Sequence, residues 1–267
     1  MDIKGRLRGA AYRIGTPRLL LKTLSDPVDA LTRLANRHGS DKGDAHLSRH
    51  AYTRVYGPLF APLRDRPVRV LEIGLLHLRA SGGWADPARR NAGGQRAGDA
   101  PSLRMWADYF PRAEIFGFDL NDFSGIEVPR TSIVQGDMGD PDDLARLVRE
   151  TGGRFDVVIE DASHASHHQQ IALAHLFPHV APGGLYAIED LRFQPPALER
   201  PDAEPTRAVL RRGGACGDWR SSYIDDAAAA RLAEQVASVE FYDSLAPDAP
   251  LTRNDSLAVL RKRPAPR

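Results

Sequence analysis

The chain has 267 residues, of which 42% are hydrophobic and 27% are charged, and its formal net charge is +1 at pH 7. This balance is that of an ordinary globular protein with a substantial core, and it gives no indication of nucleic-acid binding. The single cysteine, Cys216, excludes an intrachain disulfide and a cysteine-built metal site, which favours a cytoplasmic protein. No apolar run approaches the roughly 20 residues that a transmembrane helix needs.

Residues 1–45 form the first predicted unit, a helical accessory segment before a main domain over residues 46–267. The first 24 residues are basic and partly apolar, but they lack the long apolar region of a signal peptide. We expect a helix that packs on the domain or on a partner subunit. An amphipathic helix lying on a membrane surface is the alternative.

Seven short apolar runs with β-strand composition follow, and most are separated by stretches with helical spacing. They lie at residues 68–73, 113–120, 131–137, 155–161, 181–190, 238–243 and 256–262. This alternation predicts an α/β fold with a doubly wound, mostly parallel, seven-stranded sheet. No convincing helix separates the last two runs, so we expect them to pair antiparallel.

Two long segments do not fit this alternation. Residues 77–101 are rich in Gly, Arg and Ala, and residues 192–217 are rich in Pro and Arg. Each follows the carboxyl end of a predicted strand, where ligands bind in open α/β sheets. We therefore expect loops that act as lids or contact the substrate, with disordered segments as the alternative.

Acidic residues end the first two predicted strands. Glu72 is followed two residues later by Gly74, which allows a sharp turn beside a ligand, and Glu72 could bind a cationic or hydroxylated group. Asp119 ends the next strand, where an acid can accept both ribose hydroxyls of a nucleoside. Ordinary turns after buried strands would give the same pattern.

The third strand ends in a similar way, at Asp137 and Met138. Such an acid can accept a hydrogen bond from an adenine amino group, while the flexible thioether packs on the ring. Asp140 or Asp142 would instead cap the helix that follows. Both interpretations can hold, because they use different aspartates.

Two later strands each end in an acidic pair, Glu160-Asp161 and Glu189-Asp190. Neighbouring parallel strands finish side by side, so we expect three or four of these carboxylates to converge at one edge. Like charges at short range repel unless a cation lies between them. Mg²⁺ suits a site built from few carboxylates, substrate and water, so the pattern predicts a magnesium site.

Three histidines, His164, His167 and His168, follow the first acidic pair. Their i, i+3, i+4 spacing would place them on one helical face, and a zinc site there is an alternative. We favour a single histidine acting as a general base, with the other two as solvated or capping residues.

Seven sequence blocks then occur in a characteristic order. They are HGSDKG (38–43), HAYTRVYGPLF (50–60), VLEIG (70–74), SLRMWADYFPRAEIFGFDL (102–120), IVQGDMGD (133–140), FDVVIEDASH (155–164) and LFPHVAPGGLYAIEDL (176–191). This order resembles the Mg²⁺-dependent, S-adenosylmethionine (SAM)-dependent sugar O-methyltransferases of macrolide and polyketide tailoring, of the mycinamicin and tylosin deoxysugar type. The resemblance is specific, because the blocks are long and correctly ordered.

The resemblance implies a class I SAM-methyltransferase fold, which is Rossmann-like, with SAM and Mg²⁺ as cofactors. Asp161, Glu189 and Asp190 would bind the metal, and His164 would be the general base. The residues implied near the acceptor are His50, Tyr52 and Tyr56.

The same resemblance assigns the SAM site. Glu72 and Gly74 would line the methionine part, Asp119 would hold the ribose, and Asp137 with Met138 would hold the adenine end.

The sequence departs from the family at two places. LLHLRAS follows Gly74 where the family has a glycine-rich continuation, and this bears on the SAM loop. Residues 192–196, RFQPP, replace a Thr-Ser-Tyr-type stretch, and this bears on the identity of the acceptor.

These features predict an O-methyltransferase that methylates a hydroxyl of a sugar or glycosylated natural product, as a homo-oligomer like the resembled family. One alternative is a protein of the same fold that binds SAM without methyl transfer, in a regulatory or scaffold role. Another is an O-methyltransferase for a catechol-like acceptor.

Overall fold

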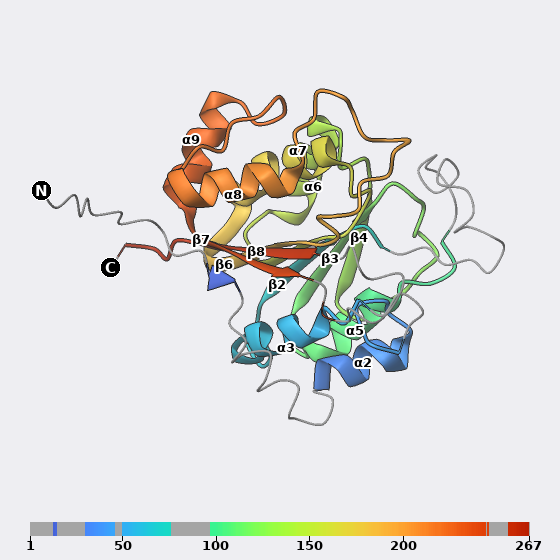
Figure 1. Ribbon diagram of the computed structural model, residues 1–267. Helices are drawn as coiled ribbons and strands as arrows, with labels where there is room; N and C mark the ends of the chain where they lie inside the picture. The colour runs from blue at the N-terminus through green and yellow to red at the C-terminus, as the bar shows by residue number, and fades with distance from the viewer. Residues whose placement is uncertain are drawn as a thin grey trace, which may run out of the picture.

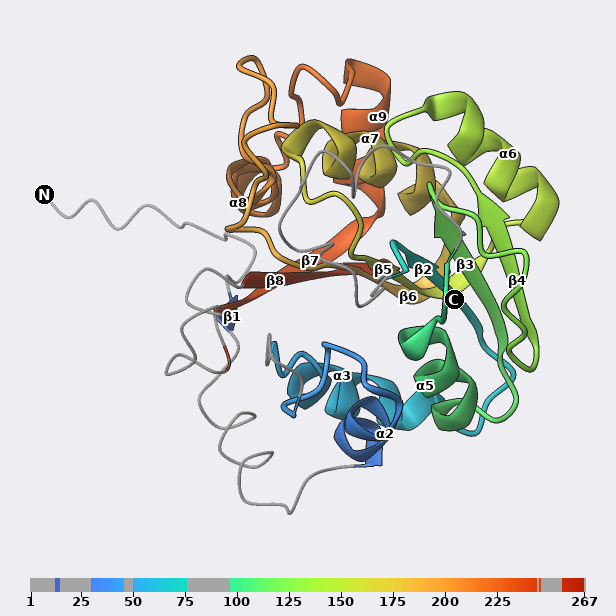
Figure 2. The same ribbon diagram turned by 90° about the vertical axis from the view of Figure 1, so that its right-hand side faces the viewer.

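The computed structural model describes residues 30–45, 50–75, 97–243, 245 and 256–266, and the backbone of residues 13–14. These residues form three layers, with one sheet between two groups of helices (Figure 1). The layers are clearest with the sheet seen edge-on (Figure 2). Among the described residues, no helix is long and apolar enough to cross a membrane.

The sheet has the strand order β1-β7-β8-β6-β5-β2-β3-β4. Its strands are β1 (Arg13–Ile14), β2 (Arg69–Ile73), β3 (Glu114–Asp119), β4 (Thr131–Gln135), β5 (Phe155–Glu160), β6 (Val180–Ile188), β7 (Val236–Asp243) and β8 (Ser256–Lys262). All pairs are parallel except β6–β8 and β7–β8. The seven predicted strands and the antiparallel final pair are confirmed, and the two-residue β1 adds an edge strand that the sequence analysis missed.

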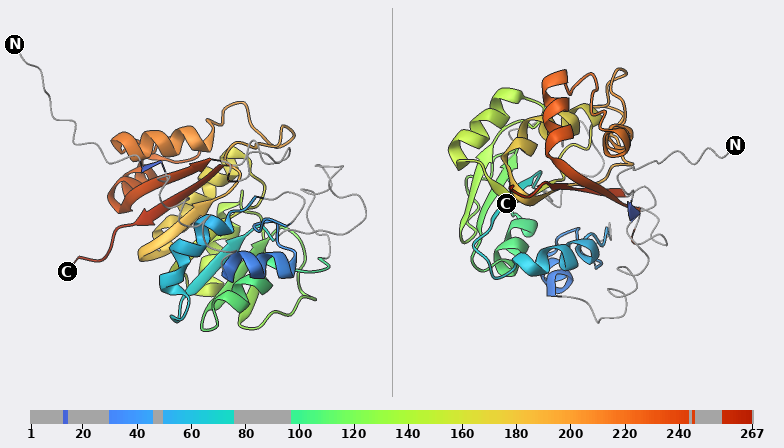
Figure 3. Two further views of the ribbon diagram at one scale, coloured as in Figure 1. Left: turned by 60° about the horizontal axis from the view of Figure 1, so that its bottom comes forward. Right: turned by 90° about the vertical axis from the view of Figure 1, so that its left-hand side faces the viewer.

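The helices divide between the two faces of the sheet (Figure 2). One face carries α2 (Ala30–His38), α3 (Thr53–Phe60) and α5 (Pro101–Tyr109), and the other carries α6 (Pro141–Thr151), α7 (Ser166–Leu176), α8 (Thr206–Cys216) and α9 (Asp226–Gln235). Short 3₁₀ helices, η1 (Ala61–Leu63) and η2 (Phe177–His179), follow α3 and α7. In Figure 3 the orange helices α8 and α9 lie over the red strands β7 and β8.

Each central strand is apolar on both sides, because helices cover both faces of the sheet. In β5, Val158 packs in the core cluster under α6–α9, whereas Val157 and Ile159 pack in the cluster above α2, α3 and α5. This alternation follows the two-residue period of a strand.

Local signals set the ends of α6. The Asp140 carboxylate accepts a hydrogen bond of 2.9 Å from the backbone N–H of Asp142. Gly152 follows the helix in the left-handed conformation, with φ of 76°. The capping interpretation is therefore confirmed for Asp140, which leaves Asp137 for a separate role.

The segment at residues 192–217 is not the continuous loop that the sequence analysis expected. Its second half forms α8, in which Val209 and Leu210 are fully buried in the core. The sequence analysis did not predict this helix, because its apolar pair is short and lies in a segment rich in Pro and Arg. In the other expected lid, residues 76–96 lie outside the described residues.

The predicted N-terminal unit is described only in part. Within it, α2 buries Leu31 and Ala35 completely in the core that it shares with α3 and α5. A boundary at residue 45 stays a prediction. The helix expected in the first 24 residues is wrong at Arg13–Ile14, which form the edge strand β1 instead. The rest of that segment lies outside the described part of the chain.

Candidate active site

The carboxyl ends of β2, β3, β5 and β6 meet at one edge of the sheet, as the topology required. The backbone N–H of Gly74 donates to Phe118 O at 2.8 Å, and that of Asp161 donates to Ile73 O at 2.8 Å. The N–H of Glu189 donates to Glu160 O at 2.9 Å. These bonds fix the residues that follow each strand relative to one another.

Gly74 permits this close approach. Its φ is +85°, and a Cβ at this position would lie 2.3 Å from the backbone oxygen of Asp161. A side chain would therefore be strained and would also collide with backbone that cannot yield. Gly74 thus holds the end of β2 against the residue predicted to bind the metal.

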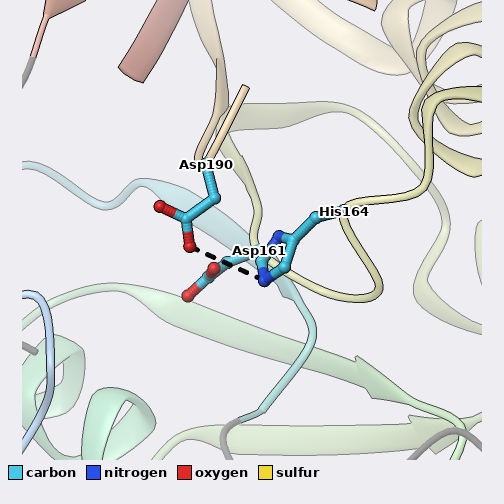
Figure 4. A group of neighbouring side chains, drawn as sticks. All are labelled: Asp161, His164 and Asp190. Carbon is cyan, nitrogen blue, oxygen red and sulfur yellow. Dashed lines mark ion pairs between the residues drawn. The ribbon is translucent and has the colours of Figure 1, made fainter. Parts of the chain in front are cut away.

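Asp161, His164 and Asp190 form a compact group at this edge (Figure 4). Each offers a ligand atom within 4.8 Å of the others, and they are the group suited to a metal ion among the described residues. His164 Nε2 lies 3.6 Å from Asp190 Oδ2. His164 and Asp190 both have left-handed backbones, with φ of 60° and 53°, a strained arrangement that clusters at functional sites.

Tyrosine and histidine side chains support Asp190. The Tyr52 hydroxyl donates to Asp190 Oδ1 at 2.6 Å, and His50 Nδ1 lies 3.8 Å from the same oxygen. The His50 ring stacks on Tyr52 with centroids 5.3 Å apart. Because Tyr52 is only 1% exposed, its contact with an acceptor would be indirect, through Asp190.

Lys42 is the main site residue that the sequence analysis missed. It is 1% exposed, and its ammonium forms ion pairs with Asp161, with Glu189 Oε2 at 3.0 Å and with Glu72 Oε1 at 3.3 Å. Burial alone would lower the pKa of Lys42, but these carboxylates outweigh it and raise the pKa well above its ordinary value. The available signal was a lysine within the block HGSDKG.

Glu189 faces Lys42 and Tyr56 rather than the group around His164. The Tyr56 hydroxyl donates to Glu189 Oε1 at 2.5 Å, and Lys42 binds the other oxygen. Burial and the neighbouring Asp161 raise the pKa of Glu189 well above its ordinary value. Glu189 is therefore not in the group of converging ligand atoms, and its role as a metal ligand stays a prediction.

The charges at this edge fit a divalent cation. The carboxylates of Glu72, Asp161 and Glu189 share one ammonium group, that of Lys42. A fourth carboxylate, that of Asp190, lies within 4.8 Å of Asp161. Such an excess of buried negative charge takes up protons or a cation. Carboxylate oxygens of Asp161 and Asp190 are donors that suit Mg²⁺, whereas the nitrogen of His164 is better suited to take a proton.

Glu72, which was predicted to line the methionine part of SAM, is buried in the interior of the protein. It is 0% exposed, and its Oε2 accepts from the Trp106 indole at 3.1 Å. Burial raises the pKa of Glu72 to about 7, and the Lys42 ammonium opposes this shift. Glu72 links β2 to the acidic group through Lys42.

The residues predicted for the ribose and adenine lie at the ends of β3 and β4. Asp119 accepts from the backbone N–H of Leu75 at 2.7 Å and from that of Asn121 at 2.8 Å. Asp137 accepts from the N–H of Gly139 at 2.7 Å, and Met138 is 4% exposed. These half-buried acids and the buried thioether form a row beside Gly74, which fits the chemistry of a nucleoside.

The three histidines do not share a helical face. His164 precedes α7, whereas His167 and His168 lie in its first turn. His168 Nδ1 is 2.8 Å from the Ser163 hydroxyl, and burial together with His168 lowers the pKa of His167 to about 4. Within the described residues His167 and His168 belong to no metal-binding group, so the structure gives the zinc alternative no support.

Glu160, whose environment the sequence left open, is fully buried with one carboxylate oxygen lacking a hydrogen bond. Burial raises its pKa to about 8. The folded pKa exceeds the unfolded value of 4.5, so this acid's contribution to stability is complete below 4.5 and is lost as the pH rises through about 8.

Replacing Glu160 with Gln should therefore flatten the dependence of stability on pH. One pKa unit is worth about 1.4 kcal/mol, and about three units separate pH 5 from the folded pKa of about 8. Between pH 5 and 9 the parent should therefore lose on the order of 4 kcal/mol more than the variant. Urea unfolding with EDTA across this range measures the difference. Glu150→Gln, at an exposed position of α6, should behave like the parent, and equal pH profiles for Glu160→Gln and the parent would contradict the expectation.

Comparison with known proteins first defines the class of fold. The MycE methyltransferase from the mycinamycin biosynthetic pathway, solved in complex with Mg, SAH and mycinamycin VI, superposes with a TM-score of 0.59 at 28% identity. The match covers 90% of this chain and 56% of that one. The chain has the class I SAM-methyltransferase fold, as the sequence predicted.

Relatives found by sequence show which kind of methyltransferase the chain is similar to. The chain is 44% identical over 175 residues to the 8-demethyl-8-alpha-L-rhamnosyl tetracenomycin-C 2'-O-methyltransferase of Streptomyces olivaceus. It is 43% identical over 142 residues to the mycinamicin VI 2''-O-methyltransferase of Micromonospora griseorubida. The resemblance to sugar O-methyltransferases of macrolide and polyketide pathways is thereby confirmed.

These relatives are longer than the chain. The matches cover 66% and 53% of this chain but only 41% and 32% of the two relatives. The chain therefore corresponds to less than half of each. No model of a protein family matches it.

Proposed function

We propose that the chain is a SAM-dependent, divalent-metal-dependent O-methyltransferase that methylates a hydroxyl of a sugar in a glycosylated natural product. The observation that carries this proposal is the convergence of Asp161, His164 and Asp190 at the strand ends. Gly74 and Asp119, which suit a nucleoside, lie at the same edge. The similarity to sugar O-methyltransferases supports the same reaction and a glycoside acceptor.

The chain would hold SAM along β2, β3 and β4. Gly74 gives the backbone room, Asp119 accepts from the ribose hydroxyls, and Asp137 with Met138 holds the adenine. SAM supplies the methyl group. The protein contributes mainly by placing the acceptor oxygen in line with that group.

The metal would be held by Asp161 and Asp190, with Glu189 as the further ligand that the family resemblance implies. Bound Mg²⁺ supplies positive charge that lowers the pKa of a neighbouring hydroxyl. Tyr52 holds Asp190 in place, while Lys42 holds Asp161.

His164 would take the proton of the acceptor hydroxyl. Its Nε2 faces Asp190 at 3.6 Å, which orients the ring toward the acidic group. Once the oxygen has lost its proton to His164, it is the better nucleophile that methyl transfer requires.

Replacing His164 with Ala should lower kcat by about 10²–10⁴-fold, the usual contribution of a general base. Metal binding should persist, because Asp161 and Asp190 remain. Initial rates and isothermal titration with Mg²⁺ measure the two effects. His175→Ala, at an exposed position near the end of α7, is the control and should keep the parental rate. A parental rate for His164→Ala would refute the base assignment.

Titration calorimetry with SAM separates this function from a binding role without chemistry. We expect SAM to bind with and without Mg²⁺, and turnover to need the metal. No SAM binding would refute the proposal, and SAM binding with no effect of metal on turnover would favour a metal-free or non-catalytic protein.

We further propose that the protein is cytoplasmic and a homo-oligomer without nucleic-acid partners. The near-neutral charge and the single cysteine support this, as does the expected packing of the N-terminal segment. Sedimentation velocity should give a mass above that of one 29.3 kDa chain.

A further inference from the structure

Phe193 is the exposed large hydrophobic side chain among the residues that the structure describes, with 48% of its surface accessible. A single exposed hydrophobic residue is ordinary in itself. The position of Phe193 is what indicates a function. Its ring lies edge to face with the ring of His164, at a centroid distance of 6.1 Å. An accessible aromatic face therefore stands beside the proposed base.

Hydrogen bonds fix the backbone on which this ring stands. The N–H of Phe193 donates to Asp190 O at 2.9 Å, which closes a turn directly after the proposed metal ligand. Leu191, inside the turn, is buried, and its N–H donates to Ser256 O at 2.9 Å. Pro195 is buried on the other side of Phe193. A ligand that contacts Phe193 would not have to order this segment first.

Polar and aromatic groups both lie close to His164. Asp190 lies 3.6 Å from its Nε2, and the partly accessible His50 lies beside Asp190; both suit hydroxyl groups. The Phe193 ring, in contact with the His164 ring, adds an apolar surface. This combination suits a ring with hydroxyls on one face or edge and C–H groups on another, which is the character of a pyranose.

Building on the function proposed above, we propose that Phe193 is a stacking platform for the sugar ring that carries the methylated hydroxyl. That hydroxyl must come within about 3 Å of His164 to give up its proton. The sugar ring that bears this hydroxyl then lies next to Phe193. The aglycone of the acceptor lies farther from Phe193 than this ring does. Sugar C–H groups pack favourably on the electron-rich face of an aromatic ring.

Phe193 lies within residues 192–196, the stretch that the sequence analysis connects with the identity of the acceptor. As a platform it would select acceptors by the apolar face of their sugar.

The test uses the full chain with SAM, Mg²⁺ and methyl rhamnoside as the probe. Phe193→Ala should raise KM for the glycoside about tenfold, as expected for a lost aromatic contact, with kcat and the KM for SAM little changed. Phe193→Tyr keeps the ring and should match the parent. Phe193→Leu keeps a hydrophobic side chain without the aromatic face, and it should resemble the Ala variant.

Saturation-transfer NMR measures binding of the same glycoside without turnover, so it separates this inference from the proposed function. We expect transfer to the sugar C–H protons in the parent and the Tyr variant, and its loss in the Ala variant. This result supports the platform even if the parent transfers no methyl group, an outcome that would refute only the proposed function. Equal transfer in parent and Ala variant, or none in the parent, would overturn the inference.

A change in molar mass in sedimentation experiments on Phe193→Ala, with glycoside binding unaltered, would also overturn it. Phe193 would then be covered by a second copy of the chain.

Discussion

Replacing Asp161 with Asn should abolish metal-dependent turnover while SAM binding stays close to that of the parent. Asp161 offers a ligand atom to the group with His164 and Asp190, and it also binds Lys42. Asn has nearly the same shape but no charge, so it is a poor ligand for Mg²⁺. The SAM contacts predicted for Asp119 and Asp137 come from β3 and β4, and the substitution does not touch them.

Initial rates over a range of Mg²⁺ concentrations, with titration calorimetry for SAM, measure both parts of this expectation. Asp142→Asn is a matched control, because it makes the same chemical change at an exposed position in the first turn of α6. That variant should respond to Mg²⁺ like the parent. If Asp161→Asn kept the parental response to Mg²⁺, Asp161 would not be a metal ligand.

Replacing Lys42 with Met should lower the free energy of unfolding by about 3–5 kcal/mol, the usual cost of removing one partner from a buried ion pair. Met fills a similar volume, but it leaves Glu72, Asp161 and Glu189 without the ammonium that they share. Their mutual repulsion would then be uncompensated in a buried environment. Urea unfolding in EDTA at a fixed pH measures the loss without a contribution from bound metal.

A second variant separates the charge effect from a packing effect. Lys42→Met combined with Glu189→Gln removes one of the uncompensated charges, so it should regain part of the lost stability. Lys262→Met is the control, because that lysine is half-buried and donates to the backbone oxygens of Phe177 and Pro178 rather than to carboxylates. A Lys42→Met protein as stable as the parent would show that the cluster needs no ammonium.

The seven main strands could be predicted from sequence because their signal is local. Each is a short run of strand-forming residues, and in the central strands burial on both faces makes the apolar run nearly continuous. The exceptions were elements with a weak local signal. β1 has only two residues, and α8 hides Val209 and Leu210 among prolines and arginines.

The acidic part of the site could also be predicted, because parallel topology brings the ends of neighbouring strands together. Asp161 and Asp190 are nearly thirty residues apart and yet share one metal-binding group. The direction of each side chain could not be predicted. Glu189 follows the same strand as Asp190, but its oxygens bind Lys42 and Tyr56.

The roles of Lys42 and Phe193 could not be predicted from the sequence. Lys42 lies 119 positions before Asp161, and a lysine in a polar block is normally exposed, so its burial depends on tertiary packing alone. In the sequence, Phe193 is one residue of the stretch RFQPP, and nothing in that stretch singles it out as a site residue. Its importance comes from its distance to His164, which no local pattern encodes.

Mass spectrometry of glycosides incubated with the protein and SAM that carries a deuterated methyl group tests the central claim most directly. We predict a product labelled with one CD₃ group in the presence of Mg²⁺ and none in the presence of EDTA. Catechols should remain unlabelled in the same incubations. Equal labelling with and without EDTA, or no labelled glycoside although SAM binds, would contradict the assignment of a metal-dependent sugar O-methyltransferase.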